Sequence, residues 1–422
     1  MAEDPGIAAD TREERARAEW RSVVVAFLDA HARVRTGLGD WSTTPVHDTP
    51  EAEAEYFARC RAWQRTVYDA GFAGITWPRE HGGRGGAGWQ QAVYRAEEAR
   101  YDVSSGFIAS TIALAGAALM THGDAGQQAR HLRRLLRADD VWCQLFSEPD
   151  AGSDLANLAT RATADGDEFV VDGQKVWTSG AHHADFGLLL ARTDPTVPKH
   201  RGITFFVLDM CSPGVEVRPL RQMTGAAHFN EVFLHGVRVP RTQVVGEVHA
   251  GWPVARTVLA AESAMIGNSS RFDVVAELTR VVRARGRAAD PVVRQGLARV
   301  VTRERILALL RERLRRDVLR GARPSIDGSV LKLLWSQAWA ARAELGASLF
   351  GPYAAAGPLD EDTEDEDTED ARYWRTQMLA RFGGSIGGGT DEIHRNHVAE
   401  RVLGLPPEPR VDRDVPWRDS RG

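Results

Sequence analysis

Two neighbouring stretches of the sequence carry side chains suited to a flat, polar-edged ligand. The first, QLFSEPDAGSDL from Gln144 to Leu155, predicts a loop after a strand, with hydroxyls, carboxylates and small residues close together. Ser147 could hydrogen-bond the rim of the ligand, and Gly152 and Ser153 would let a phosphate or pantetheine group approach the main chain. Taken alone, such a loop is more often structural than functional.

The second stretch, KVWTSG from Lys175 to Gly180, predicts a strand that contributes to the same site. Side chains alternate along a strand, so we expect Trp177 and Ser179 to share one face. An indole plane beside a hydroxyl suits the isoalloxazine ring of a flavin, through ring contact and a hydrogen bond near N5 and O4. Without the first stretch, a core tryptophan with a satisfied hydroxyl would be the favoured interpretation.

A third stretch, SIGGGTDEIHRN from Ser385 to Asn396, predicts a glycine loop that leads into a helix. Free N–H groups and the positive end of the helix dipole favour a diphosphate at such a position. Asp391 and Glu392 add negative charge in the same turn, so we expect them to cap the helix or to accept ribose hydroxyls.

The elements around these motifs follow an α, then β, then α order. Apolar residues at three- and four-residue spacing predict helices at both ends, and short β-rich runs separated by Gly, Pro and Asp turns predict strands in the middle. We therefore expect an α+β fold with an N-terminal α-helical domain (1–140), a central antiparallel, barrel-like β domain (141–250) and a C-terminal helical bundle (251–422).

Two local patterns stand out in the C-terminal part. ADPVVRQGLARV predicts a helix with Asp290 as N-cap and Pro291 at the first helical position. The acidic run DEDTEDEDTED, from Asp360 to Asp370, cannot bury an apolar face, so we expect a solvated loop. It lacks the central Gly and terminal Glu of a calcium-binding loop.

Composition argues against several classes of protein. A net charge of −5 and a pI near 6.3 argue against a nucleic-acid partner. Only Lys175, Lys199 and Lys332 are lysines, and we interpret the dominance of arginine as a coding bias and not as a binding device. Three separated cysteines without a C-x-x-C pair predict neither a disulfide framework nor a zinc site.

Location is inferred from the same features. The cysteine pattern fits a reducing cytoplasm, and the acidic N-terminus lacks the apolar run of a secretory signal. The most apolar segment, Gly106–Met120, is too short to span a membrane and predicts a buried helix. We therefore expect a cytoplasmic protein with no metal, nucleic-acid or membrane partner.

Five ordered motifs, which cover nearly the whole chain, resemble the acyl-CoA dehydrogenase family. They are AGFAGITWPREHGG, CQLFSEPDAGSDLA, DGQKVWTSGAHHAD, the strand-rich segment from RGITFFVLDM to FNEVFLHGVRVP, and GGTDEIHRNHVAERVLGLP. The resemblance implies FAD held between the β domain and the C-terminal helices, and α,β-desaturation of an acyl-CoA thioester, as in fatty-acid β-oxidation. It also implies an electron-transferring flavoprotein as electron acceptor, and a tetramer of identical or of related, unlike subunits.

The resemblance also implies roles for individual positions. Ser153 matches a contact to the thioester part of CoA, and Thr390 and Glu392 match contacts to the diphosphate or ribose side of FAD. The positions that match flavin contacts are Leu145, Phe146, Ser147, Trp177 and Ser179.

Desaturation requires a base for the proton alpha to the thioester carbonyl, and donors for the developing enolate oxygen. Many family members place a Glu directly before the Gly-Thr of the C-terminal loop, but this chain has Gly388, whose N–H could still bind the substrate oxygen. Other members take the base from the first helix after the β domain, where VLAAESAMIG places Glu262. Apolar neighbours would raise the pKa of Glu262, so we expect it to be the base. The alternative is a solvent-facing helix glutamate.

Departures from the family pattern leave assembly and substrate open. Ser263 stands where Arg often follows the helix Glu, and the Arg-x-x-Phe-Gly segment that often reaches a neighbouring FAD is not evident between Met265 and Val301. These losses resemble branches built from two unlike subunits. The alternatives are a carrier-protein-linked dehydrogenase, an oxidase or monooxygenase of the same fold, and a non-catalytic subunit that completes a partner's flavin site. Glycines at 387–389 leave room for a bulky or branched acyl group.

Overall fold

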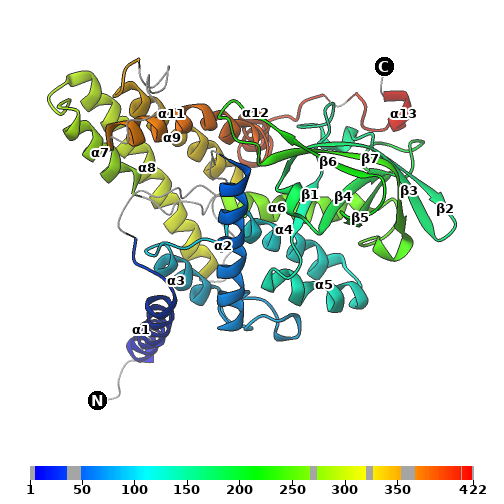
Figure 1. Ribbon diagram of the computed structural model, residues 1–422, viewed down its shortest axis with the longest axis horizontal. Coiled ribbons are helices and arrows are strands. Elements are labelled where there is room, and N and C mark those ends of the chain that lie inside the picture. The colour runs from blue at the N-terminus through cyan, green and yellow to red at the C-terminus, as the bar shows by residue number, and fades with distance from the viewer. Residues whose placement is uncertain are drawn as a thin grey trace.

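The computed structural model describes residues 5–35, 49–266, 273–319, 327–352, 366–409 and 411–420. The chain forms a group of helices, a curled sheet and a second group of helices, in that order (Figure 1). The expected α+β layout is confirmed. None of the described helices combines the length and the apolar surface that a membrane crossing requires.

The N-terminal part of the described chain is built from helices. They are α1 (Pro5–His31), α2 (Pro50–Asp69), α3 (Gly88–Glu98), α4 (Gly106–His122) and α5 (Ala125–Arg137). The predicted buried helix is α4, which packs against α2, α5, α6 and the first strand. The start of α2 is fixed by Thr49, whose Oγ1 accepts the Ala52 N–H at 3.2 Å.

The central sheet is mixed. Its strands are β1 (Trp142–Leu145), β2 (Arg161–Asp165), β3 (Glu168–Ser179), β4 (Phe186–Arg192), β5 (Ile203–Asp209), β6 (Val215–Leu220) and β7 (Phe229–Pro240). The strand order is β1-β4-β2-β3-β7-β6, with β5 paired to β4. Most pairs are antiparallel, as expected, but β4 pairs in parallel with β1 and, at one position, with β2. The chain between β1 and β4 is long enough for the crossover that a parallel pair needs.

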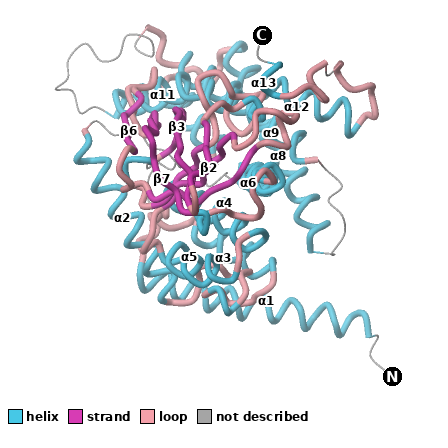
Figure 2. Tube along the Cα trace, turned by 90° about the vertical axis from the view of Figure 1, so that its right-hand side faces the viewer, coloured by secondary structure: helices cyan, strands magenta, loops and turns pink. Residues whose placement is uncertain are grey.

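Alternate residues of the sheet enter two different cores. Trp142, Leu188 and Phe205 belong to a core shared with the N-terminal helices and α6, whereas Cys143 and Leu189 belong to a core on the opposite face. This alternation follows from the two-residue period of a strand. The sheet is therefore buried on both faces at β1, β4 and β5. Figure 2 shows the strands, in magenta, above α3, α4 and α5.

The C-terminal helices begin directly after the sheet. They are α6 (Gly251–Ile266), α7 (Val274–Ala284), α8 (Pro291–Leu319), α9 (Gly328–Ser348), α11 (Glu366–Ile386), α12 (Asp391–His397), a π-helical turn η5 (Val398–Val402) and α13 (Trp417–Ser420). The predicted start of α8 is confirmed, because the Asp290 carboxylate accepts the N–H of Val292 at 2.8 Å. Short 3₁₀ turns are η1 (Arg79–His81), η2 (Leu155–Asn157), η3 (Ala181–His183) and η4 (Arg241–Gln243).

The end of the acidic run is helical. Residues 366–370 form the start of α11, and Asp370 is buried at 6% exposure. Both of its carboxylate oxygens lie 2.7 Å from Nη2 of Arg280 on α7. The expectation of a solvated loop is wrong for this part, because a basic partner on another helix offsets the cost of burying the carboxylate. Residues 360–365 lie outside the described residues.

Candidate active site

A buried ion pair holds the loop after β1. Lys175 on β3 is fully buried, and its Nζ donates to Glu148 Oε1 at 2.8 Å and to the Phe146 carbonyl at 3.1 Å. The Glu148 carboxylate also accepts the N–H groups of Ala159 and Thr160, at 2.6 and 2.9 Å. Burial opposes the charge on Glu148, but Lys175 and these donors lower its pKa below the ordinary value. The ion pair therefore ties both ends of the loop to β3.

A second lysine holds the middle of the loop. Lys199 Nζ donates to the carboxylates of Asp154 and Asp412, at 2.7 and 2.6 Å. Asp412 belongs to the C-terminal segment, which returns to the β domain (Figure 1). There the Trp417 ring lies 4.7 Å from the guanidinium carbon of Arg192. Lys175 and Lys199, which are distant in sequence, thus hold the loop at Phe146, Glu148 and Asp154.

The loop side chains predicted to bind a ligand differ in exposure. Leu145 and Phe146 are 0% and 3% exposed and lie in the two opposite cores, so only their main chain can contact a cofactor. Ser147 is half-buried, and its carbonyl accepts the N–H of Val176 at 2.9 Å. Ser153 is exposed, and a Cβ added to Gly152 would meet nothing within 4 Å. The main chain at the tip of the loop is open to a ligand.

β3 carries a bulge at Trp177. Between Lys175 and Thr178 the strand has one residue more than its partner β7, and Trp177 has a φ of 61°. The bulge leaves the indole 56% exposed, with its edge against Phe229 at 5.7 Å between ring centroids. Strict alternation would place Lys175 on the face of Trp177, yet Lys175 is fully buried. Because of the bulge, Trp177 and Ser179 are both less buried than Thr178, which lies between them.

Glu262, near the end of α6, lies beside β1. Its side chain is half-buried, and the carboxylate accepts a hydrogen bond from the side chain of Gln144. Burial raises the pKa of Glu262, and the bond from Gln144 opposes this only in part. Gln144 directly precedes the Leu145–Ser147 segment, so the structure brings the predicted base and the predicted flavin loop together.

The glycine loop is short and tightly wound. α11 extends to Ile386, and Gly388 and Gly389 adopt φ values of 66° and 87°, which favour glycine. The Gly388 carbonyl accepts a hydrogen bond from His394 Nε2 at 2.9 Å. Thr390 is the N-cap of α12, and its Oγ1 accepts the Ile393 N–H at 3.2 Å.

The two acids that follow Thr390 point in different directions. Asp391 faces α9, where it accepts hydrogen bonds from Ser336 Oγ at 2.8 Å and Lys332 Nζ at 3.3 Å. Lys332 is 1% exposed and also donates to the Gly389 carbonyl at 2.7 Å. Thr390 takes the capping role that was also expected of Asp391, and both bonds to Asp391 reach Oδ1, so its expected contact to a ribose stays a prediction. The Glu392 side chain is 76% exposed, and its Oε1 pairs with Arg395 Nη1 at 2.9 Å on the surface of α12.

Sequence reasoning missed these lysine anchors. The dominance of arginine over lysine is interpreted above as a coding bias without a binding role. Each of the three lysines nevertheless holds a loop of the candidate site. Their partners are distant in sequence, so no local pattern reveals them. The available signal was their rarity among 53 basic residues, combined with the motif that contains Lys175.

Comparison with known proteins identifies the family. Residues 37–139, 143–237 and 249–403 match, in order, the N-terminal, middle and C-terminal domains of acyl-CoA dehydrogenases. The protein named acyl-CoA dehydrogenase IpdE1 of Mycobacterium tuberculosis is 36% identical over 400 residues, which cover 94% of this chain and 98% of that protein. This chain belongs to the acyl-CoA dehydrogenase family.

Solved structures agree with this assignment. The structure named Tcur3481-Tcur3483 steroid ACAD has a TM-score of 0.74 and 28% identity, covering 97% of this chain and 100% of that one. The ChsE4-ChsE5 complex from Mycobacterium tuberculosis has a TM-score of 0.70 and 26% identity, with coverage of 97% and 100%. As a member of the acyl-CoA dehydrogenase family, the chain is an oxidoreductase of a flavoprotein family.

The site fits the FAD that acyl-CoA dehydrogenases carry. Trp177 presents a broad indole surface that a flat ring system would cover, and the bulge holds it in place. At the start of α12, Gly388 and Gly389 leave the main chain without side chains in front of a helix N-terminus. Both features are what a flavin and its diphosphate require.

Proposed function

We propose that this acyl-CoA dehydrogenase uses FAD to introduce an α,β double bond into an acyl-CoA thioester, with Glu262 as the base. The position of Glu262 carries the proposal: the carboxylate is half-buried, has a raised pKa and is bonded to the strand that leads into the Ser147 loop. The other position known to supply a base in the family is Gly388, which has no acidic group. Bound FAD would supply the acceptor for the hydride that leaves the β-carbon.

Proton removal and substrate binding are assigned to residues of this chain. Glu262 removes the α-proton in its ionised form, and burial, which raises its pKa, makes it a stronger base. The Gly388 N–H is the donor proposed for the thioester oxygen as negative charge develops there. Ser153, on the exposed tip of its loop, binds the pantetheine side of the substrate.

The other predicted positions hold the cofactor. Trp177 and Ser179 would contact the ring system of FAD, and Ser147 would bind its polar edge together with the main chain of Leu145 and Phe146. Thr390 and Glu392 would bind the diphosphate or ribose side. Electrons then pass to an electron-transferring flavoprotein.

The substrate class is a bulky acyl-CoA, and the assembly contains a related, unlike subunit. Gly388 stands where many family members carry a Glu side chain, and one similar structure is named a steroid ACAD. Two similar structures bear the names of paired proteins, Tcur3481-Tcur3483 and ChsE4-ChsE5. A preference for short, straight acyl-CoA or a fully active homotetramer would contradict these two points.

Replacing the base gives the direct test. Glu262→Gln should bind FAD and substrate as before but lose exchange of the substrate α-proton with deuterated water, together with acyl-CoA-dependent bleaching of the flavin. Arg256→Gln, which alters an exposed residue on the same helix, serves as the matched control. Unchanged turnover in Glu262→Gln would remove Glu262 from the mechanism.

The same assay separates the alternative functions. The chain is purified alone and with a related subunit, and flavin content and bleaching by acyl-CoA and acyl-carrier-protein substrates are compared. Bleaching only by carrier-bound substrates indicates a carrier-linked enzyme, and rapid reoxidation by oxygen indicates an oxidase. Full activity of Glu262→Gln in the complex with the partner indicates a non-catalytic subunit.

A further inference from the structure

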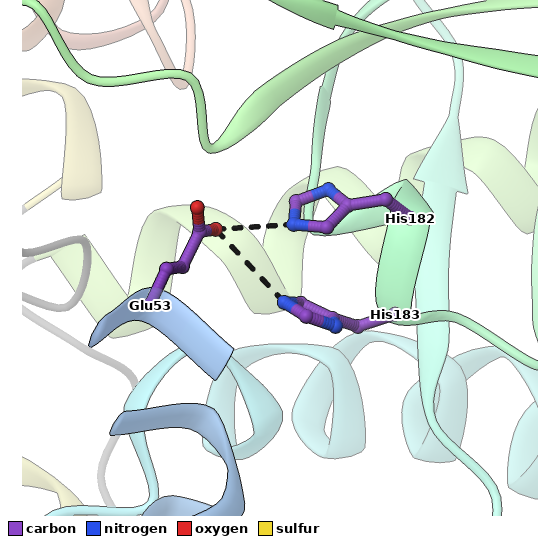
Figure 3. Close-up of side chains that lie close together, drawn as sticks. All are labelled: Glu53, His182 and His183. Atoms are coloured by element: carbon purple, nitrogen blue, oxygen red, sulfur yellow. Dashed lines mark hydrogen bonds and ion pairs between the residues drawn. The ribbon is translucent and has the colours of Figure 1, made fainter. Parts of the chain in front are cut away.

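Three metal-ligating side chains meet outside the candidate active site. Glu53 lies in the first turn of α2, and His182 and His183 lie on η3, directly after β3 (Figure 3). His182 Nε2 is 3.1 Å from Glu53 Oε1, and His183 Nε2 is 3.9 Å from the same oxygen. One ligand atom from each residue lies within 4.8 Å of the other two. His182 is 129 residues from Glu53 in sequence, and His183 follows it directly, so only the fold brings the three together.

The hydrogen bonds of Asn230 determine which ring nitrogen of His182 carries a proton, and this points to a cation between His182 and Glu53. The Asn230 amide nitrogen donates to the Thr178 carbonyl at 3.0 Å, which fixes the direction of the amide. The Asn230 oxygen then faces His182 Nδ1 at 3.1 Å, so Nδ1 carries the proton. A neutral His182 would turn the lone pair of Nε2 toward a carboxylate oxygen. That contact is repulsive unless a proton or a metal ion lies between the two atoms.

His183 supplies the second nitrogen. Its ring stacks on Phe57, with centroids 4.2 Å apart and planes 6° from parallel. Nε2 is buried and makes no hydrogen bond within the described part of the chain. A buried, unbonded nitrogen turned toward a carboxylate is an incomplete arrangement that a cation would complete.

We propose that Glu53, His182 and His183 bind a zinc ion with a fourth position for water. Two nitrogens and one carboxylate are a zinc ligand set, and tetrahedral ligands about 2.0–2.1 Å from zinc lie about 3.3 Å from one another. The two distances from Glu53 Oε1, 3.1 and 3.9 Å, bracket that value, and all three ligand atoms lie within 4.8 Å of one another. Asn230 would act as the outer partner that fixes His182.

The zinc site would join two parts of the fold. Glu53 brings the N-terminal helices, whereas the histidines bring the turn that follows Ser179. The ion would therefore stabilise the junction of α2 with the strand that carries Trp177. This inference does not depend on the proposed desaturation, because the three ligands take no part in it.

Metal titration of the flavin-loaded protein tests the site. After chelator treatment and dialysis, calorimetric titration with zinc chloride should show one equivalent bound, and cobalt(II) should give the visible absorption of a tetrahedral site. Zinc should also raise the thermal unfolding midpoint. The cobalt measurement needs no variant, so it remains decisive even if a ligand substitution prevents folding.

Variants then assign the ligands. Glu53→Gln and His183→Ala should each weaken zinc binding by more than about 100-fold, beyond the loss typical of an outer partner. His235→Ala, at an exposed histidine on β7, should bind zinc like the unmodified protein. Absence of stoichiometric binding, or equal binding by all three variants, would overturn the proposal and leave a protonated His182 paired with Glu53.

Discussion

Replacing Lys175 with Met tests whether the buried ion pair holds the flavin loop. The substitution keeps an unbranched side chain in a fully buried position but removes the only charged partner of Glu148 among the described residues. Loss of one member of a buried pair costs about 3–5 kcal/mol. Glu148 keeps two backbone donors, from Ala159 and Thr160, so we expect the lower end, about 3 kcal/mol of unfolding free energy.

The assay is urea unfolding followed by tryptophan fluorescence, with FAD affinity measured in parallel. The double variant Lys175→Met/Glu148→Gln should recover part of the loss, because no unpaired charge remains buried. Arg161→Met is the matched control, since its ion pair with Asp172 is exposed and should contribute little.

FAD affinity decides whether the loop itself has moved. Lys175→Met should weaken FAD binding more than Arg161→Met does, because Ser147 lies between the two residues that Lys175 contacts. A loss below about 1 kcal/mol, the size of an ordinary hydrogen bond, together with unchanged FAD affinity, would refute the argument.

Further predictions concern Glu262 and the glycine loop before α12. Because burial raises the pKa of Glu262, kcat/KM should rise with pH through that raised value as the base ionises. The stability contributed by its protonated form is fully present below the ordinary pKa of 4.5 and is lost as pH rises through the raised pKa. Glu262→Gln should therefore resist urea better than the unmodified protein at alkaline pH, and equal resistance would contradict the shift. Lys332→Met should cost about 1–3 kcal/mol, because it removes the side-chain donor to the Gly389 carbonyl and leaves Asp391 with Ser336 but without its cationic partner. Its control, Glu392→Gln, should leave urea resistance unchanged and weaken FAD binding, and the reverse pattern would contradict both assignments.

The order of elements and the loop motifs were predictable because their signals are local. Hydrophobic periodicity, turn residues and the Asp290-Pro291 cap depend on neighbours along the chain, and they predicted the α, β, α order and the start of α8. The direction of Asp391 was not predictable in this way. It depends on Lys332 and Ser336 of another helix, 59 and 55 residues away.

Trp177 illustrates a second kind of limit to sequence reasoning. The two-residue period gave Trp177 and Ser179 a common face, but the same period would have exposed Lys175 with them. The bulge explains why the two side chains differ in exposure. Because β3 has one extra residue there, the Lys175 side chain enters the interior while the Trp177 side chain stays exposed. The bulge depends on the register of β3 against β7, which sequence alone does not specify.

The scarcity of lysine, which seemed uninformative, acquires a meaning from the structure. If a coding bias replaces lysine by arginine wherever both fit, the lysines that remain mark positions where a guanidinium does not fit. All three have side chains at most 12% exposed, and each donates to an acceptor in a site loop. A compact ammonium can place its donors on a carbonyl and a carboxylate in a space too small for a planar guanidinium. In a chain so rich in arginine, the rare lysine is therefore a guide to the buried anchors that position a site.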